Sequence, residues 1–195
     1  DDPEMSKQFL EKASRNVDRL AFFIKDLDAI SKLESGEIPV KYDRFNLTDL
    51  IHEVIDSLEL KAKKYNITLH FKEKYHGPAW VYADREKIRQ VLVNLIDNSF
   101  KYGKSGGNTS IKTFELHDQI LVEITDDGIG IEEKYLPRLF ERFYRTDKSR
   151  SRQIGGSGLG LAIVKHIIEA HQQTITVRST ESIGSTFGFT LQRDT

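Results

Sequence analysis

The chain has 195 residues, of which 38% are hydrophobic, enough for one domain with a core and one additional element. Its 29 basic and 30 acidic residues nearly cancel to a net charge of -1, which excludes an overall field that favours nucleic acid or an anionic membrane. It has no cysteine, which excludes disulfides and thiolate metal sites and fits a reducing cytoplasm. Its longest apolar run, residues 20–24, is too short to span a membrane.

Residues 3–33 are predicted to form one long helix. Its apolar side chains recur seven residues apart in two interleaved series, which are Leu10, Val17 and Ile24, and Ala13, Leu20 and Leu27. The resulting stripe cannot be covered by its own helix, so we expect partner helices. Phe22 and Phe23 widen the stripe and favour a bundle, with packing against the same chain as the alternative.

The rest of the chain alternates helices with strands. After a linker with a possible edge strand, Asn46 and Asp84 are placed to cap two amphipathic helices, and a third helix is expected through residues 161–168. Strands are expected at 67–71, 80–82, 109–116, 120–125, 174–179 and 186–191. This order predicts an α/β (α+β) two-layer sandwich, with a mixed, mainly antiparallel sheet and helices on one face.

Two glycine clusters flank the long irregular segment 126–157. The first, Asp126-Asp127-Gly128-Ile129-Gly130, follows a strand, and the second, Gly155-Gly156-Ser157-Gly158-Leu159-Gly160, precedes a helix. Glycines permit positive φ and close backbone approach, and the unpaired N–H groups of a helix start attract an anion. The second cluster therefore predicts a phosphate site, for which a triphosphate is the natural ligand.

Residues 138–152, between the clusters, carry a local excess of positive charge. The basic residues are Arg138, Arg142, Arg145, Lys148, Arg150 and Arg152, and the acidic ones are Glu141 and Asp147. In a nearly neutral chain this excess indicates an anion patch on a lid. A solvated loop is the alternative.

The helix that begins at Asp84 carries polar residues on one stripe, where Asn94, Asn98 and Lys101 are spaced four and three apart. The amide oxygen of Asn98 can bind a hard cation, and Lys101 can reach a phosphate. A polar surface stripe is the alternative. Another phosphate template is not favoured, because the P-loop-like segment 103–105 follows a helix and lacks the upstream glycine.

His166 and His171 do not form a metal face, because they lie five apart on a helix.

Five segments in order closely resemble the conserved boxes of two-component sensor histidine kinases. They are Asn94 to Tyr102 (N box), Asp126 to Gly130 (first glycine box), Leu139 to Arg145 (F box), Gly156 to Gly160 (second glycine box) and Gly184 to Phe187 (closing glycine box). Residues 27–36 also resemble the end of the second dimerisation helix, so the resemblance covers essentially the whole chain.

The resemblance implies three parts. Residues 1–36 would be the second helix of a dimerisation and histidine-phosphotransfer hairpin, residues 37–45 a linker, and residues 46–195 the ATP-binding catalytic domain. The phospho-accepting histidine of the family lies on the first helix of that hairpin, which is absent from this sequence. We therefore expect the fragment to bind ATP with Mg²⁺ and to lack autophosphorylation.

The resemblance also implies roles at the phosphates. Asn98, helped by Asn94, would coordinate Mg²⁺, while Lys101 and Tyr102 would contact phosphate and ribose. Tyr144 and Arg145 would lie against the nucleotide or its γ-phosphate. The residues expected to act in transfer itself are Asn94, Lys101 and Arg145.

The glycine boxes would hold the base and the lid. Asp126 would accept a hydrogen bond from the adenine amine, and Gly128 and Gly130 would let the base approach. The lid over the phosphates would hinge on Gly156, Gly158 and Gly160, and Leu159 would belong to the nucleotide-binding residues.

The implied activity is transfer of the γ-phosphate to a histidine, for relay to an aspartate of a response regulator. The implied partners are ATP, a receiver domain and a second copy bound through the dimerisation helices, with no nucleic acid. The location would be cytoplasmic, with a membrane reached only through upstream segments. Related ATPases carry a water-activating glutamate at the position of Asn94, so its absence favours transfer. A related ATPase or serine kinase acting on a protein partner, and a dimer module with a degenerate nucleotide site, stay open as alternatives.

Overall fold

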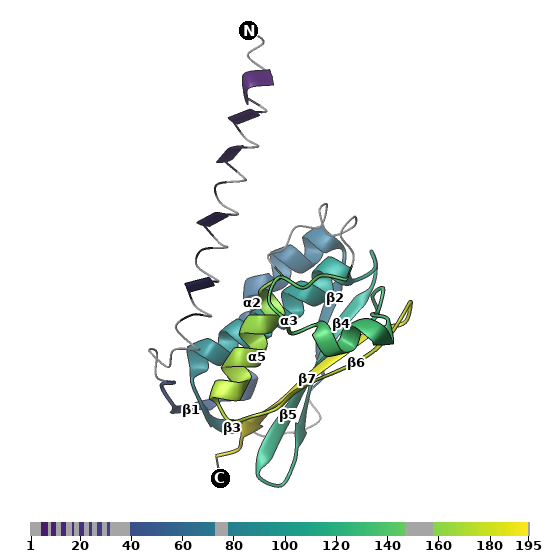
Figure 1. Cartoon of the computed structure of the whole chain (residues 1–195). Coiled ribbons are helices and arrows are strands. Elements are labelled where there is room, and N and C mark those ends of the chain that lie inside the picture. Colours follow the sequence, from purple (N-terminus) through teal and green to yellow (C-terminus); the bar gives the residue numbers. More distant parts are fainter. Residues whose placement is uncertain are drawn as a thin grey trace.

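The computed structural model describes residues 40–72, 78–146 and 158–194, together with 5–7, 9, 10, 13, 14, 17, 20, 21, 24, 27, 28 and 31. Those between 5 and 31 are all helical, as predicted, and they project away from the rest of the chain (Figure 1). Their apolar side chains are exposed, Phe9 by 72% and Ile24 by 68%. In a single chain, the described part of the apolar stripe therefore lies in solvent.

From residue 43 onward, helices and strands follow in the predicted order. They are β1 (Asp43–Asn46), α2 (Leu47–Tyr65), β2 (Thr68–Lys72), β3 (Trp80–Ala83), α3 (Arg85–Tyr102), β4 (Asn108–Glu115), β5 (Gln119–Asp126), the 3-10 helix η1 (Glu133–Arg138), α5 (Gly160–Ala170), β6 (Ile175–Thr180) and β7 (Gly184–Gln192). The possible edge strand of the linker is β1. None of the described helices is long and apolar enough to cross a membrane.

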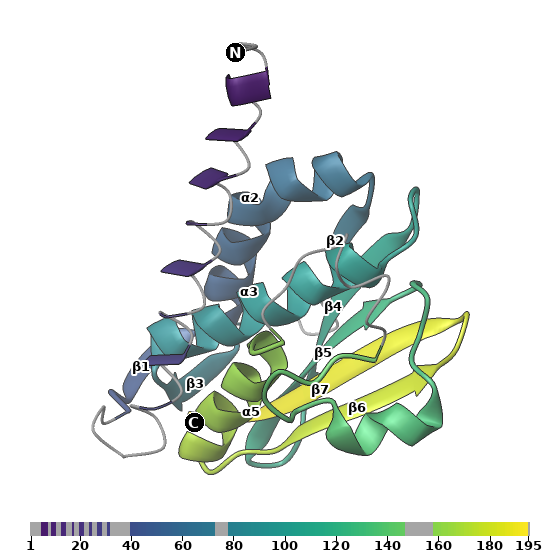
Figure 2. The same ribbon diagram turned by 45° about the horizontal axis from the view of Figure 1, so that its top comes forward.

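The sheet and the helices form two layers. The main sheet has the strand order β2-β4-β5-β7-β6, in which only β2 and β4 pair in parallel among these described strands. β1 and β3 pair antiparallel in a separate small sheet. Helices α2, α3 and α5 lie side by side on one face of the main sheet (Figures 1 and 2). The predicted sandwich with a mainly antiparallel mixed sheet is therefore confirmed.

Side-chain caps set where α2 and α3 begin, and the core sets which face of α3 is buried. Asn46 accepts a hydrogen bond of 3.1 Å from the amide of Thr48, and Asp84 accepts one of 3.1 Å from the amide of Lys87. The buried face of α3 consists of Ile88, Val91, Leu92, Leu95, Ile96, Ser99 and Phe100. Full burial of one such large apolar side chain stabilises by roughly 1.5–3 kcal/mol, so this face fixes the rotation of the helix. The polar stripe is thereby held at the edge of the core.

Candidate functional site

The polar stripe of α3 is half-buried, as Asn94, Asn98 and Lys101 all lie between core and solvent. The side-chain nitrogen of Asn94 is buried without a hydrogen-bond partner among the described residues. A buried amide group without a partner is costly, and a polar ligand would satisfy it. The three residues that the sequence placed on one stripe are thus brought together.

Lys101 is already engaged within the protein. Its ammonium group lies 2.7 Å from one carboxylate oxygen of Asp97, and Lys61 of α2 forms an ion pair with the other oxygen. Burial alone would raise the pKa of Asp97, but the hydrogen bonds from Lys101 and Lys61 outweigh it and lower that pKa. Asp97 is therefore an ionised member of the stripe, which the sequence analysis missed although its spacing to Lys101 is that of an i, i+4 pair.

Asp126 ends strand β5 and is buried, with 9% of the residue exposed. One oxygen accepts a hydrogen bond of 2.9 Å from the amide of Gly128. Burial raises the pKa of Asp126, and this backbone hydrogen bond opposes the rise. A carboxylate can accept several hydrogen bonds, so Asp126 retains capacity for a donor from a ligand.

The glycines of the first cluster are required by the protein backbone itself. A Cβ on Gly128 would overlap the carbonyl oxygen of Tyr102, which also accepts a hydrogen bond of 3.0 Å from the amide of Ile129. Gly130 has φ of +66°, and a Cβ there would overlap the carbonyl oxygen of Thr180. The first cluster is thus packed against the end of α3 and the end of β6.

The second cluster leads into α5 and meets the stripe of α3. Gly158 has φ of +71°, and its carbonyl oxygen accepts a hydrogen bond of 2.9 Å from the amide of Phe143. Leu159 is fully buried, and Gly160 begins α5. A Cβ on Gly160 would lie 3.9 Å from the amide oxygen of Asn94. The start of α5 therefore faces the polar stripe.

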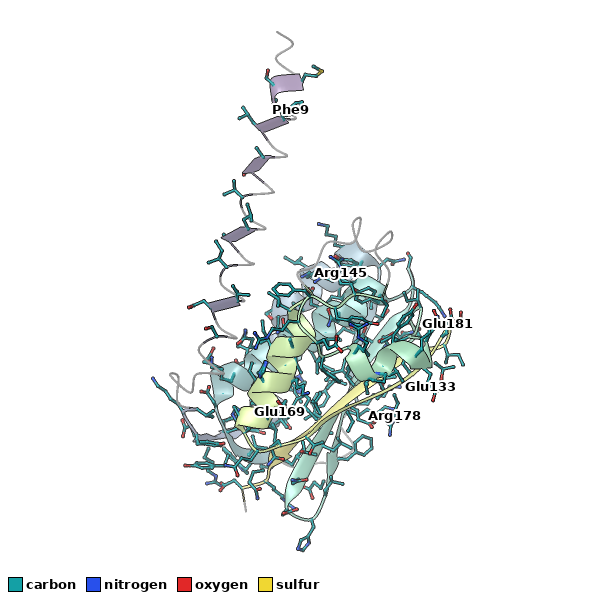
Figure 3. All side chains as sticks on the ribbon, in the orientation of Figure 1. Phe9, Glu133, Arg145, Glu169, Arg178 and Glu181 are labelled. Atoms are coloured by element: carbon teal, nitrogen blue, oxygen red, sulfur yellow. The ribbon has the colours of Figure 1, made fainter. Side chains whose placement is uncertain are left out.

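The predicted anion patch is described only in part. Arg138 forms an ion pair of 2.8 Å with Glu141, and its guanidinium lies 4.3 Å from the ring centre of Tyr144. Arg145 is half-buried, near the end of the molecule where α5 begins (Figure 3). Arg142 is exposed, and the other predicted members of the patch, Lys148, Arg150 and Arg152, lie outside the described residues, as do Gly155, Gly156 and Ser157 of the second glycine cluster.

The donor set favours a hard cation held together with an anion. Over the described ranges, no group of three or more histidine, aspartate or glutamate side chains can hold a metal ion. The oxygens of Asn94 and Asn98 lie on the stripe instead, and amide oxygens suit Mg²⁺ when phosphate supplies further ligands. The buried side-chain nitrogen of Asn94, which has no partner among the described residues, is a hydrogen-bond donor, so it fits the anion of such a pair, while the amide oxygens fit the cation.

The chain is similar to known proteins along most of its length. Residues 83–195 match the family described as histidine kinase-, DNA gyrase B-, and HSP90-like ATPase. Drug sensory protein A of Synechocystis sp. is 39% identical over 197 residues, which cover 95% of this chain and 29% of that protein. Sensor histidine kinase WalK of Bacillus subtilis is 33% identical over 190 residues, which cover 96% of this chain and 31% of that protein. The chain thus spans less than a third of either relative.

Solved structures of histidine kinase ThkA share the fold. Its catalytic domain superimposes with a TM-score of 0.69 at 30% identity, covering 78% of this chain and 96% of that one. ThkA in complex with response regulator protein TrrA gives a TM-score of 0.78 at 28% identity, covering 100% of this chain and 53% of that one.

Proposed function

The chain belongs to the family of histidine kinase-, DNA gyrase B-, and HSP90-like ATPases, its relatives are sensor histidine kinases, and from this premise we propose that residues 46–195 bind Mg-ATP for phosphoryl transfer. In the complete kinase, the γ-phosphate would pass to a histidine of the dimerisation hairpin and then to a response-regulator aspartate. The observation that carries the proposal is the half-buried stripe of Asn94, Asn98 and Lys101 facing the glycine start of α5.

Each part of the site has a role in this proposal. Asn98, with Asn94, would hold Mg²⁺, which when bound neutralises charge on the phosphates. Lys101 would supply a point charge to a phosphate, and backbone amides at the start of α5 would donate to another. Asp126 would orient the base by accepting from the adenine amine. Phosphoryl transfer needs mainly positioning and charge neutralisation, and this set provides both.

The roles of Tyr102, Tyr144, Arg145 and the lid glycines belong to the same proposal. Arg145 is half-buried near the start of α5, where it can approach a γ-phosphate. Asn94 cannot act as a general base, because an amide does not take up a proton near neutral pH. Its presence favours transfer of the phosphoryl group over hydrolysis.

The partners follow from the same proposal. The exposed apolar side chains of the N-terminal helix support a homodimer through residues 1–36, with residues 37–45 as the linker. Similarity to a kinase solved with its response regulator supports a receiver domain as the second protein partner. The chain would act in the cytoplasm.

Calorimetric titration with ATP, with and without Mg²⁺, tests the site. Asn98→Ala is expected to abolish the increase in ATP affinity that Mg²⁺ produces in the unaltered chain. Gln90→Ala is the matched control, because it removes an amide from α3 about two turns away. Unchanged magnesium dependence in Asn98→Ala would overturn the proposed metal site, and no measurable ATP binding by the unaltered chain would indicate a degenerate module.

A second experiment tests the reaction. The chain is mixed with a separately made acceptor helix and labelled ATP, and acid-labile label on that helix is the expected result. Acid-stable label, or steady ATP turnover without the helix, would instead indicate a serine kinase or an ATPase.

A further inference from the structure

The carboxylate of Asp97 lies between lysines of two helices. One oxygen is 2.7 Å from the ammonium of Lys101 on α3, and the other pairs with Lys61 on α2. The side chains of Asp97 and Lys101 are 17% and 22% exposed, so solvent screens this pair less than an ordinary surface ion pair. The arrangement fixes the end of Lys101 before any ligand arrives.

Lys101 keeps donors for a ligand in this arrangement. An ammonium group has three N–H donors, and Asp97 uses one of them. The trio of Asp97, Lys61 and Lys101 carries a net positive charge, so it still attracts an anion. If the carboxylate were absent, the two ammonium groups would repel each other and Lys101 would regain its rotamer freedom.

We propose that Asp97 is a positioning residue, which aims Lys101 at the phosphates of ATP and is itself anchored to α2 by Lys61. The inference rests on the proposed function, because it assigns Lys101 to a phosphate. A simple charge argument predicts the opposite outcome, since removal of a negative charge beside a polyphosphate should tighten binding. The sign of the effect therefore separates positioning from general electrostatics.

Asp97→Asn in the full chain tests the proposal by calorimetry with Mg-ATP and with adenosine. We expect affinity for Mg-ATP to fall about fivefold, as the rotamer freedom of one lysine implies, while affinity for adenosine stays unchanged. Glu53→Gln is the matched control, because Glu53 also joins α2 to α3, through Arg85 and Arg89 at the start of α3. That variant should bind both ligands as the unaltered chain does.

A double-mutant cycle with Lys101→Ala shows whether Asp97 acts through the lysine. In the Lys101→Ala background, Asp97→Asn is expected to cause no further loss. Tighter ATP binding in both backgrounds would overturn the proposal in favour of simple repulsion. Equal weakening of ATP and adenosine would overturn it in favour of a general structural role.

Lys61→Met tests the anchor if Asp97→Asn folds poorly. Because it also removes a positive charge, its loss counts for the anchor only if it disappears in the Lys101→Ala background, as we expect. We expect about a twofold loss of affinity for Mg-ATP and none for adenosine; no loss for either ligand would overturn the anchor role. If the unaltered chain binds ATP and Asp97→Asn matches it, this inference alone fails. If the unaltered chain binds no ATP, the proposed function fails with it.

Discussion

The backbone amide of Phe143 donates a hydrogen bond of 2.9 Å to the carbonyl oxygen of Gly158, which joins the chain on either side of residues 144–157. Both residues have a left-handed backbone, with φ of 60° at Phe143 and 71° at Gly158. Glycine adopts this conformation without steric cost, whereas other L residues do so rarely. The junction holds the start of α5, and with it Gly160, beside Asn94.

Gly158→Ala is expected to lower the free energy of unfolding by about 1–2 kcal/mol, because alanine must enter the left-handed region. The added Cβ would also lie 3.0 Å from the Cα of Phe143, which leaves the junction little room to relax. Thermal unfolding followed by circular dichroism measures the effect, at roughly 2–4 °C in Tm per kcal/mol for a chain of this size.

Phe143→Asn is the control for that substitution. The side chain of Phe143 is 56% exposed, so little packing is lost, and asparagine tolerates a positive φ better than phenylalanine. We expect this variant to keep or slightly raise the Tm. A Tm of Gly158→Ala equal to that of the unaltered chain would contradict the prediction.

Asp126→Asn is expected to weaken ATP binding without loss of stability. Because burial raises the pKa of Asp126, the ionised carboxylate is disfavoured in the folded chain relative to the unfolded chain. The contribution of Asp126 to the free energy of unfolding therefore decreases as pH rises above the ordinary aspartate pKa of about 3.8. Asparagine removes that cost and can still accept from the amide of Gly128. Chemical denaturation at neutral pH should show an unchanged or higher unfolding free energy, and titration about 10- to 100-fold weaker ATP binding.

Asp127→Asn should have the reverse effect. The two carboxylate oxygens of Asp127 accept from the backbone amide of Asn108 at 2.9 and 3.0 Å and from its side chain at 3.2 Å. An amide replaces one of these acceptors with a donor, so we expect a loss of about 1–2 kcal/mol in stability. ATP affinity, measured where the variant is fully folded, should stay close to that of the unaltered chain. Equal losses of stability in Asp126→Asn and Asp127→Asn would contradict the different roles given to these two aspartates.

Local patterns account for most of the architecture. The periodicity of apolar residues predicted each strand and helix from residue 46 onward, and Asn46 and Asp84 cap helices as expected. The parallel pairing of β2 with β4 was not predicted, because alternation shows which face of a strand is buried but not which strand lies next to it.

The arrangement of the candidate site could be predicted only where its residues share one element. Asn94, Asn98 and Lys101 follow from helix spacing, whereas the ion pair of Lys61 with Asp97 joins two helices and leaves no sequence pattern. The structure gives a further reason for the glycines of the first cluster, because the carbonyl oxygens of Tyr102 and Thr180 lie against Gly128 and Gly130. The approach of a base to these glycines stays a prediction.

His171 joins the ends of two helices to the chain that enters the domain. Its Nε2 accepts a hydrogen bond of 2.9 Å from the amide of Asp84, and its Nδ1 donates one of 2.7 Å to the carbonyl oxygen of Ile167. Asp84 also accepts from the amide of Lys41, and the ring of Tyr42 packs edge-on against the imidazole. Since Nε2 must be an acceptor, only the neutral imidazole satisfies this network.

The stability of the domain should therefore decrease in mildly acidic solution. Burial lowers the pKa of His171, although the hydrogen bond to Ile167 and the charge of Asp84 oppose the shift, while Lys87 adds to it. The contribution of neutral His171 to the free energy of unfolding is complete above 6.5, the ordinary pKa of histidine. It is lost as pH falls below that pKa, because the unfolded chain then binds more protons than the folded chain. Urea unfolding between about pH 8 and pH 5 should show a smaller pH dependence in His171→Gln, with about 1 kcal/mol less stability at the higher pH. His117→Gln, at an exposed turn, should keep the full dependence, and an unchanged slope in His171→Gln would contradict the role given to this histidine.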